Sequence, residues 1–261
     1  MRVLVTGASR GIGRAICLRL ARQGCQVVAC ASTHAEELRT AVEEAASMGG
    51  SVVAINGDLS EASTPARLVE QAVAAMGGLD AVVSNAGVSR PSTLAKLALE
   101  DWDYLFAVNA RAPWLLAKAA YSALRESRGS FVSIASMSGV QPYPGMGAYS
   151  PSKAALLMLV RTLAQEWAAD GIRVNAVSPG LIHTSLTAQV YADAPTKAAR
   201  EALVPLHRIG DPDADIAGLV AFLINSDAGY ITGQNLLADG GLMDTVHSLI
   251  PGRPASERKQ P

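Results

Sequence analysis

Short apolar runs alternate with longer helical patterns along most of this 261-residue chain, and that alternation limits the folds open to it. Six continuous apolar runs have the pattern of strands covered on both faces, and a seventh is weaker. The runs occupy residues 2–6, 26–31, 51–56, 81–84, 130–135, 173–178 and 235–238, and the helical patterns occupy residues 12–23, 35–47, 64–76, 99–126, 152–169 and 213–224. This order predicts an α/β fold in which helices cover both faces of a doubly wound parallel sheet of about seven strands.

No internal repeat or low-complexity linker divides the chain, so we expect one domain over residues 1–247. Residues 183–207 contain Pro195 and Pro205 and few strong apolar anchors, which indicates a mobile lid on the substrate side. Residues 248–261 are polar with a charged end, a composition typical of a flexible tail.

Composition excludes several classes of protein. Lysine and arginine number 22 and aspartate and glutamate 23, so a net charge of −1 provides no general field for nucleic acid or an anionic membrane. No apolar stretch reaches the ~18 residues of a spanning helix, and no secretory signal is recognised at the start. The cysteines at positions 17, 25 and 30 lack the paired spacing of a zinc site, and no other cluster has metal-ligand spacing. We therefore expect a cytoplasmic protein with reduced thiols and without a catalytic metal.

The first strand runs into the glycine-rich turn Gly7-Ala8-Ser9-Arg10-Gly11-Ile12-Gly13, which a helix follows. Glycines let backbone N–H groups approach a pyrophosphate closely, and the helix start adds its positive dipole end. The spacing Gly-x-x-x-Gly-x-Gly differs from the commonest dinucleotide fingerprint, so a purely structural turn stays open as the alternative. The predicted contacts of a Rossmann-like site here are Gly7, Ser9, Arg10, Gly11, Ile12 and Gly13.

The end of the second strand usually selects between the two nicotinamide cofactors. An acid about 20 residues after the glycines binds the ribose 2′-hydroxyl of NAD and repels a 2′-phosphate. Here Ser32 and Thr33 follow the strand, and the first acid is Glu36. With the cation of Arg10 in the glycine loop, this pattern predicts a preference for NADP(H). NAD(H) stays open as the alternative, because Glu36 is near enough in sequence to reach back.

Tyr149 and Lys153 are four residues apart, which places both side chains on one face of a helix. A neighbouring ammonium favours the phenolate, so we expect the pair to lower the phenol pKa and tune it for acid/base chemistry. Ser136 follows a strand at the carboxyl edge of the predicted sheet, and Asn109 interrupts a helical pattern. Each feature also has a purely structural interpretation. Tyr149 and Lys153 could lie on a solvated helix face, Ser136 could cap a helix or turn, and Asn109 could form a helix–helix hydrogen bond.

Taken together, these features resemble the short-chain dehydrogenase/reductase family, and especially its 3-oxoacyl-carrier-protein reductase-like members. The resemblance covers about residues 1–245. It rests on Thr6-Gly7-Ala8-Ser9-Arg10-Gly11-Ile12-Gly13, Asn85-Ala86-Gly87, Asn109, Ser136, Tyr149 with Lys153, Ser178-Pro179-Gly180, Ile231-Thr232-Gly233-Gln234 and Asp239-Gly240-Gly241, all in the family's order. One departure is Ser84, where many members carry a second Asn.

The resemblance implies a role for each catalytic candidate. Tyr149 would give a proton to a substrate carbonyl oxygen, and Ser136 would hold that oxygen. Lys153 would lower the phenol pKa and hold the nicotinamide ribose, while Asn109 would anchor a water that returns the proton through Lys153. The further cofactor contacts that it implies are Asp58, Leu59, Asn85, Ala86, Gly87, Pro179, Gly180, Ile182 and Thr184, with Tyr149 and Lys153 themselves.

The expected reaction is transfer of a hydride from NADPH to a ketone or 3-oxoacyl-type carbonyl. Two alternatives remain: an NAD-dependent alcohol dehydrogenase running oxidatively, and a catalytically silent dinucleotide-binding regulator. Ser127 and Asp170 stand where carrier-protein reductases have basic residues, which favours a free or thioester-linked ketone, although Arg128 could substitute. The candidate substrate contacts, mostly apolar, are Ser138, Val140, Gln141, Tyr143, Met146 and Leu181, with Val88 beside them. Family members associate, so we also expect a homotetramer or homodimer that pairs the helices of residues 99–126 and 152–169.

Overall fold

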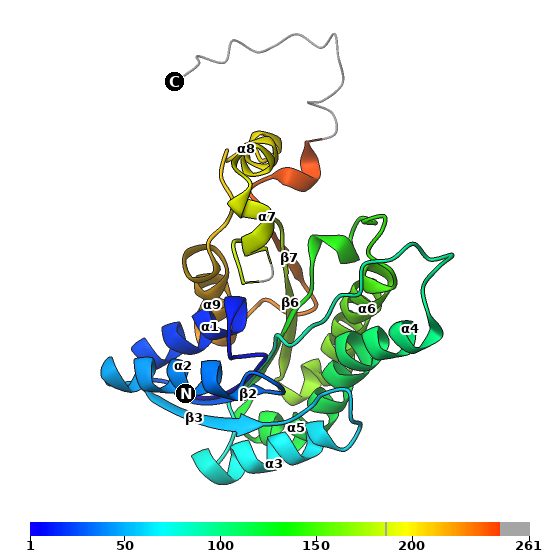
Figure 1. Cartoon of the computed structure of the whole chain (residues 1–261). Helices are drawn as coiled ribbons and strands as arrows, with labels where there is room; N and C mark the ends of the chain where they lie inside the picture. Colours follow the sequence, from blue (N-terminus) through cyan, green and yellow to red (C-terminus); the bar gives the residue numbers. More distant parts are fainter. Residues whose placement is uncertain (186, 246–261) are drawn as a thin grey trace.

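The computed structural model describes residues 1–185 and 187–245, and a sheet of seven parallel strands lies at its centre (Figure 1). The strand order is β3-β2-β1-β4-β5-β6-β7. The strands are β1 (Arg2–Thr6), β2 (Gln26–Ala31), β3 (Ser51–Asn56), β4 (Ala81–Ser84), β5 (Ser130–Ile134), β6 (Arg173–Pro179) and β7 (Asn235–Ala238). The doubly wound, Rossmann-like fold is therefore confirmed. The tail expected at residues 248–261 lies outside the described residues.

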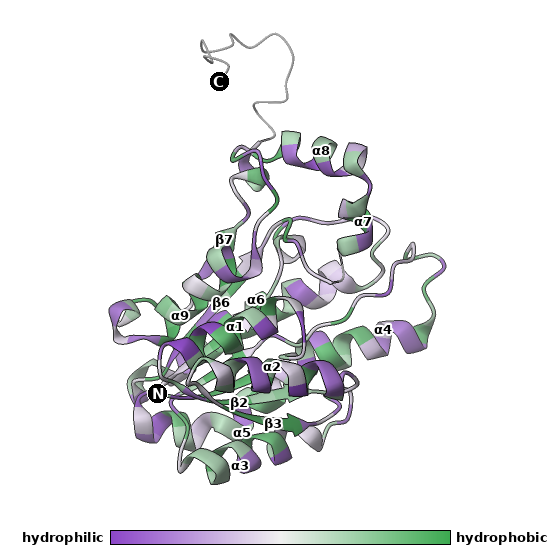
Figure 2. Ribbon diagram, turned by 60° about the vertical axis from the view of Figure 1, so that its left-hand side comes forward, coloured by the Kyte–Doolittle hydropathy of each residue, from purple (hydrophilic) through white to green (hydrophobic). Residues whose placement is uncertain are grey.

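Two layers of helices enclose this sheet, and each buries an apolar face against it. One layer contains α1 (Gly11–Arg22), α2 (Ala35–Ser47) and α9 (Gly218–Ile224); the other contains α3 (Thr64–Met76), α5 (Ala112–Ser127) and α6 (Tyr149–Trp167). In β1, Val3 and Val5 pack into the first layer, whereas Leu4 packs into the second. Because both faces of the central strands are covered, these strands carry continuous apolar runs, and β2 is buried from Val27 to Ala31. The edge strand β3 is apolar in sequence and largely green in Figure 2, but most of its residues are exposed.

Helix boundaries differ from the sequence prediction at two places near the carboxyl edge. The pattern at residues 99–126 is divided into α4 (Leu99–Phe106), a π-helical turn (Ala107–Arg111) and α5. Helix α6 begins at Tyr149 and not at residue 152, so Pro151 lies in its first turn, where a missing N–H costs no hydrogen bond. Both differences involve candidate catalytic residues.

The predicted lid segment contains two helices, α7 (Ala188–Ala192) and α8 (Ala194–Leu203), above the carboxyl edge (Figure 1). Tyr191 and Val204 are buried, with 6% and 2% of their surface exposed, so the segment has more apolar anchoring than its sequence suggested. Within the described part of the chain, no helix combines the length and apolar character needed to cross a bilayer.

The strand order places the carboxyl ends of β1 and β4 side by side, although their connections leave in opposite directions along the sheet. Open α/β sheets bind ligands at such a switch point, outside the carboxyl ends of the strands. The segments that follow β1, β4, β5 and β6 contain most of the residues singled out in the sequence.

Candidate active site

The loop after β1 has the geometry of a phosphate cradle. Gly7 and Gly11 adopt φ values of +65° and +56°, which side chains rarely tolerate. A Cβ at Gly13 would lie 2.1 Å from the Gly7 carbonyl oxygen, so helix and loop approach more closely than any other residue allows. Arg10 precedes α1 in extended conformation without a side-chain cap, which leaves the first N–H groups of the helix available for an anion. The residues present therefore fit a dinucleotide pyrophosphate. Ser9 and Ile12, also predicted contacts, belong to the same loop and first turn.

Asn85, expected to flank the cofactor, uses its side chain to hold this loop. Its amide nitrogen donates to the carbonyl oxygens of Thr6 at 2.9 Å and Gly7 at 3.1 Å. In return, the Thr6 hydroxyl accepts hydrogen bonds from the backbone N–H groups of Asn85 and Ala86, both at 3.1 Å. The ends of β1 and β4 are therefore fastened together beneath the cradle, with the 85–87 segment beside it.

The residues expected near the adenine and its ribose lie after β2 and β3. Ser32 and Thr33 are exposed directly after β2. Asp58 is exposed and accepts a hydrogen bond from the Ser60 N–H at 2.9 Å, whereas Leu59 is buried. Glu36, the residue that could favour NAD, is ion-paired with Arg39 on α2. The Arg10 backbone carbonyl accepts from the Arg14 N–H, whereas its guanidinium has no hydrogen bond or ion pair with any residue of the described ranges.

The segment after β6 approaches the cradle from the other side. The Gly180 N–H donates to the Ala238 carbonyl oxygen at 3.0 Å, next to Pro179 at the end of β6. Ile182 is buried and forms an isolated bridge with Gly210. Thr184 reaches the glycine loop, because a Cβ at Gly11 would lie 3.4 Å from the Cβ of Thr184. Of the contacts predicted after β6, Thr184 therefore lies beside the glycine loop, whereas Gly180 and Ile182 bond to neighbouring backbone.

The predicted tyrosine, serine and lysine come together just beyond β5. Tyr149 opens α6, and Ser136 forms a hydrogen bond to its phenol. The Ser136 hydroxyl also accepts from the Ser138 N–H at 3.1 Å, so the cap that the sequence left as an alternative is present as well. The Lys153 ammonium is buried, donates to the Ile134 carbonyl oxygen at 2.9 Å and lies 5.8 Å from the centre of the Tyr149 ring. The Tyr149 phenol, the Ser136 hydroxyl and the Lys153 ammonium are therefore neighbours.

The expected lowering of the phenol pKa is wrong for this structure. Burial raises the pKa of Tyr149, because desolvation disfavours the phenolate, and the hydrogen bond from Ser136 opposes this only in part. Burial also lowers the pKa of the Lys153 ammonium to about 8. Helical spacing correctly predicted that the two side chains are neighbours, but it contains no information on how much solvent each would lose.

Asn109 lies in the π-helical turn Ala107–Arg111, and its side-chain amide is bonded to protein on both sides. Its Oδ1 accepts from the Val88 N–H at 2.9 Å, while its Nδ2 donates to the Val88 carbonyl oxygen at 2.9 Å and to the Ser152 hydroxyl at 3.0 Å. A water held by this residue would have to use the second lone pair of Oδ1 or the backbone. Ser152 was not singled out in the sequence, because a serine on a helix is too common to signal a function.

The candidate substrate residues differ in how much of their surface is exposed. Val140 and Tyr143 expose 48% and 49% of their surface, and Gln141 is also exposed. Met146 is half-buried and its carbonyl oxygen accepts from the Tyr149 N–H at 3.1 Å. Ser138 is buried in the turn that Ser136 caps, Leu181 is half-buried after β6, and Val88 is half-buried beside Asn109. The exposed members of this set therefore lie on the segment that connects Ser136 to the start of α6.

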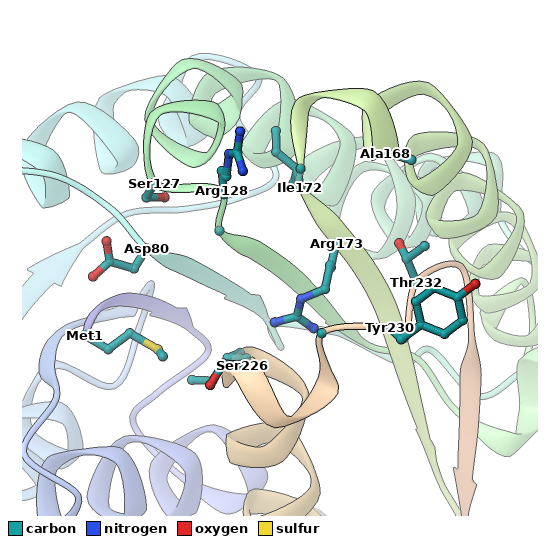
Figure 3. Close-up of a pocket in the computed structure, with 14 residues that line it drawn as sticks. Met1, Asp80, Ser127, Arg128, Ala168, Ile172, Arg173, Ser226, Tyr230 and Thr232 are labelled. Carbon is teal, nitrogen blue, oxygen red and sulfur yellow. The ribbon is translucent and has the colours of Figure 1, made fainter.

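A hollow also lies at the opposite, amino edge of the sheet (Figure 3). It has a volume of about 830 Å³, and its lining includes Asp80, Ser127, Arg128, Ile172, Arg173 and Tyr230. Two of its charged groups are already paired: Arg2 binds Asp80, and Arg173 donates to the carbonyl oxygens of Leu223 and Ala228. The size of this hollow therefore does not indicate a catalytic site. Across residues 1–185 and 187–245, no group of three or more His, Cys, Asp or Glu side chains could hold a metal ion.

Comparison with known proteins agrees with this geometry. A family model described as enoyl-(acyl carrier protein) reductase matches residues 7–243. The (3R)-3-hydroxyacyl-CoA dehydrogenase of Canis lupus familiaris is 39% identical over 248 residues, 92% of this chain and 95% of the relative. The 3beta-hydroxysteroid dehydrogenase 1 of Eggerthella lenta is 34% identical over 252 residues, 96% of this chain and 94% of the relative. A proposed NAD(P)-dependent gluconate 5-dehydrogenase from Beutenbergia cavernae, solved with NADP bound at low occupancy, has a TM-score of 0.86 at 36% identity and covers 93% of this chain and 96% of that one.

Proposed function

The chain belongs to the short-chain dehydrogenase/reductase family of oxidoreductases, and from this premise we propose that it is an NADPH-dependent carbonyl reductase. The observation that carries the proposal is the Tyr149 phenol, hydrogen-bonded to Ser136 beside the buried Lys153 ammonium. This group lies at the sheet edge where the glycine cradle fits a dinucleotide. A silent binding protein would have no need of a proton donor held there.

The proposed step adds a hydride to the carbonyl carbon and a proton to the carbonyl oxygen, which gives a secondary alcohol. Bound NADPH supplies the hydride. Tyr149 gives its phenolic proton to the oxygen, while the hydroxyl of Ser136 holds that oxygen in place. Lys153 stabilises the phenolate that results and binds the ribose hydroxyls, and the proton returns to Tyr149 from solvent through Lys153 and a water anchored by Asn109.

Near neutral pH the Tyr149 phenol is protonated even at the ordinary tyrosine pKa of ~10, so it is ready to act as the acid of a reduction. A raised pKa keeps Tyr149 protonated, which is the form that an acid needs. Oxidation of an alcohol needs the phenolate, so it gains as the pH rises. The NAD-linked oxidative dehydrogenase therefore remains the second candidate, supported by the names of the two dehydrogenase relatives.

NADP(H) is the proposed cofactor because the end of β2 offers hydroxyl groups where NAD enzymes have a carboxylate. Ser32 and Thr33 are exposed there, and Glu36 is held by Arg39. Arg10 is free to meet a 2′-phosphate. The NADP found in the similar Beutenbergia cavernae structure supports this choice for a related protein.

A ketone on an apolar skeleton is the proposed substrate class. Val140 and Tyr143 provide exposed apolar surface on the segment between Ser136 and Tyr149, and residues 137–152 contain no charged side chain. Two relatives are named for hydroxysteroid and hydroxyacyl-CoA substrates, both of which join a secondary alcohol to a large apolar group. We therefore propose steroid-like or acyl-thioester ketones, and also that the catalytic chain works as a homodimer or homotetramer in the cytoplasm.

Replacement of the phenol is the direct test of this function. In Tyr149→Phe we expect reductase kcat to fall by about 10²–10⁴-fold over a panel of ketones, because general acid catalysis contributes that much. The Kd for NADPH should stay within a few-fold of wild type. Tyr230→Phe, a change on an exposed ring at the amino edge, is the matched control and should leave kcat unchanged. Rates with NADPH and NADH are compared in the same assay.

Two outcomes would contradict the proposal. Equal kcat for wild type and Tyr149→Phe would remove the phenol from the reaction. Tight NADPH binding without turnover of any carbonyl or alcohol would favour the regulator. A kcat/KM higher with NADH than with NADPH would overturn the cofactor assignment alone.

A further inference from the structure

Ser152 is a completely buried polar residue between Tyr149 and Lys153, and the proposed reaction does not use it. Its hydroxyl donates to the Tyr149 carbonyl oxygen at 2.7 Å, the back-bond that a helical serine often makes. It also accepts a hydrogen bond from the Asn109 side chain at 3.0 Å, although the two residues are 43 positions apart. The second bond joins α6 to the π-helical turn, which a back-bonded serine alone would not do.

This second bond determines which way the Asn109 amide can face. Its Nδ2 has two hydrogens, and both have acceptors: the Val88 carbonyl oxygen and the Ser152 hydroxyl. Its Oδ1 accepts from the Val88 N–H. Without the Ser152 hydroxyl, one amide hydrogen would be buried without an acceptor, a state that proteins avoid. The Asn109 amide makes two hydrogen bonds to the Val88 backbone, which we call the Val88 clamp. Without the Ser152 hydroxyl, the orientation of the amide in this clamp would be less well fixed.

The clamp lies against the catalytic ammonium. A Cβ at Gly87 would be 3.2 Å from the Lys153 Nζ and 3.4 Å from the Asn109 Oδ1, so the lysine, the amide and the 87–88 backbone surround one point. The Lys153 ammonium makes a single hydrogen bond among the described residues, to the Ile134 carbonyl oxygen. Its position therefore depends on the packing of these neighbours as well as on that bond.

We propose that Ser152 is a positioning residue: its hydroxyl fixes the Asn109 amide and, through the clamp on Val88, the place of the Lys153 ammonium beside Tyr149. The proposal rests on the reductase function proposed above. Ser152 touches neither substrate nor cofactor in this role. It acts by linking the helix that carries the acid to the loop that borders the cofactor.

The test combines Ser152→Ala with hydrogen exchange and a pH profile. In the protein without cofactor, the Val88 amide should exchange at least tenfold faster in Ser152→Ala, because its acceptor is less well held. We expect kcat to fall about tenfold with KM for the ketone within twofold. The pH profile of alcohol oxidation should move to higher pH, because a displaced ammonium stabilises the phenolate less.

Two variants separate this role from a general loss of stability. Ser127→Ala removes a hydroxyl that bonds to the carbonyl oxygens of Leu79 and Leu124 at the amino edge, so it should change none of the three readouts. Ser152→Thr keeps the hydroxyl and should behave as wild type. The proposal is overturned if Ser152→Ala matches wild type in exchange and kcat, or if folded Ser152→Thr loses as much as Ser152→Ala. A wild-type enzyme that reduces no carbonyl would instead overturn the function and this proposal together.

Discussion

At the scale of single residues, the Lys153 ammonium is buried, although a charged group is more stable in water. The ammonium is buried and has one backbone carbonyl as its hydrogen-bond partner among the described residues. Desolvation lowers its pKa from 10.5 to about 8, so the folded protein binds this proton less tightly than the unfolded chain. Burial of this ammonium therefore costs folding stability at neutral pH, a cost that is common at functional sites.

This pKa shift predicts a pH-dependent difference between wild type and Lys153→Met. Between pH 8 and 10.5 the unfolded lysine binds more proton than the folded one, so wild-type stability rises with pH there. The methionine variant lacks this gain. We expect the wild-type free energy of unfolding, relative to Lys153→Met, to increase by about 2 kcal/mol from pH 7 to pH 10. Urea titrations at both pH values measure it.

Exposed Lys96 provides the control for that experiment. Lys96→Met should keep a constant stability difference from wild type at pH 7 and pH 10. A constant difference for Lys153→Met as well would show that the ammonium is hydrated in the folded protein. The buried pairing described for the site would then be incorrect.

At the scale of elements, close packing between loops and helix starts shapes the cofactor cradle. Helix α1 begins so near the 7–11 loop that position 13 has no room for a side chain: a Cβ there would meet the Gly7 oxygen at 2.1 Å and the Asn85 amide nitrogen at 2.4 Å. The π-helical turn before α5 presents Asn109 to the loop after β4. Single π turns often occur at functional positions, where they redirect a side chain.

Substitution of Gly13 tests this packing. Gly13→Ala should lower the free energy of unfolding by about 3 kcal/mol, because overpacked backbone must move. It should also weaken NADPH binding by at least tenfold, since the same backbone forms the cradle. Gly24→Ala is the matched control: nothing lies within 4 Å of its added Cβ, and only its φ of +78° is strained. That variant should lose about 1 kcal/mol and retain its NADPH affinity.

Calorimetric binding of NADPH to both variants provides the decisive comparison. If Gly13→Ala bound NADPH as tightly as Gly24→Ala, the 7–13 loop would not be the pyrophosphate site. The assignment of the cradle would then have to be abandoned, whatever the loss of stability.

At the scale of the whole molecule, the outer face of α5 and α6 is the surface that we propose to be covered by a second copy. Trp114 on α5 exposes 45% of its surface and Met158 on α6 exposes 58%. A groove of about 260 Å³ lies between these helices, lined by Trp114, Lys118, Tyr121, Leu163, Glu166 and Trp167. Large exposed aromatic groups on adjoining helices are typical of interfaces, and a two-fold axis would bury both copies of the groove.

Light scattering of the purified chain should therefore give a mass of two or four times 27.0 kDa at micromolar concentration. Trp114→Glu should shift the mass toward the monomer, because a charge in an apolar interface is costly to bury. Met48→Glu, at an exposed position after α2 in the other helix layer, should leave the assembly unchanged. A wild-type monomer would end the proposal, and equal effects of both variants would place the interface elsewhere.

The sequence alone determined the strand and helix order, the seven-stranded sheet and the shared face of Tyr149 and Lys153, because apolar periodicity and helical spacing are local properties. The tertiary structure decided the direction of the phenol pKa shift, since desolvation depends on every atom that surrounds the ring. It also decided that Asn85 holds the glycine loop and that Asn109 pairs with Ser152, contacts between residues 78 and 43 positions apart. Such contacts form when the helix layers pack against the sheet. A pattern of neighbouring residues in the sequence cannot show which distant residues will meet.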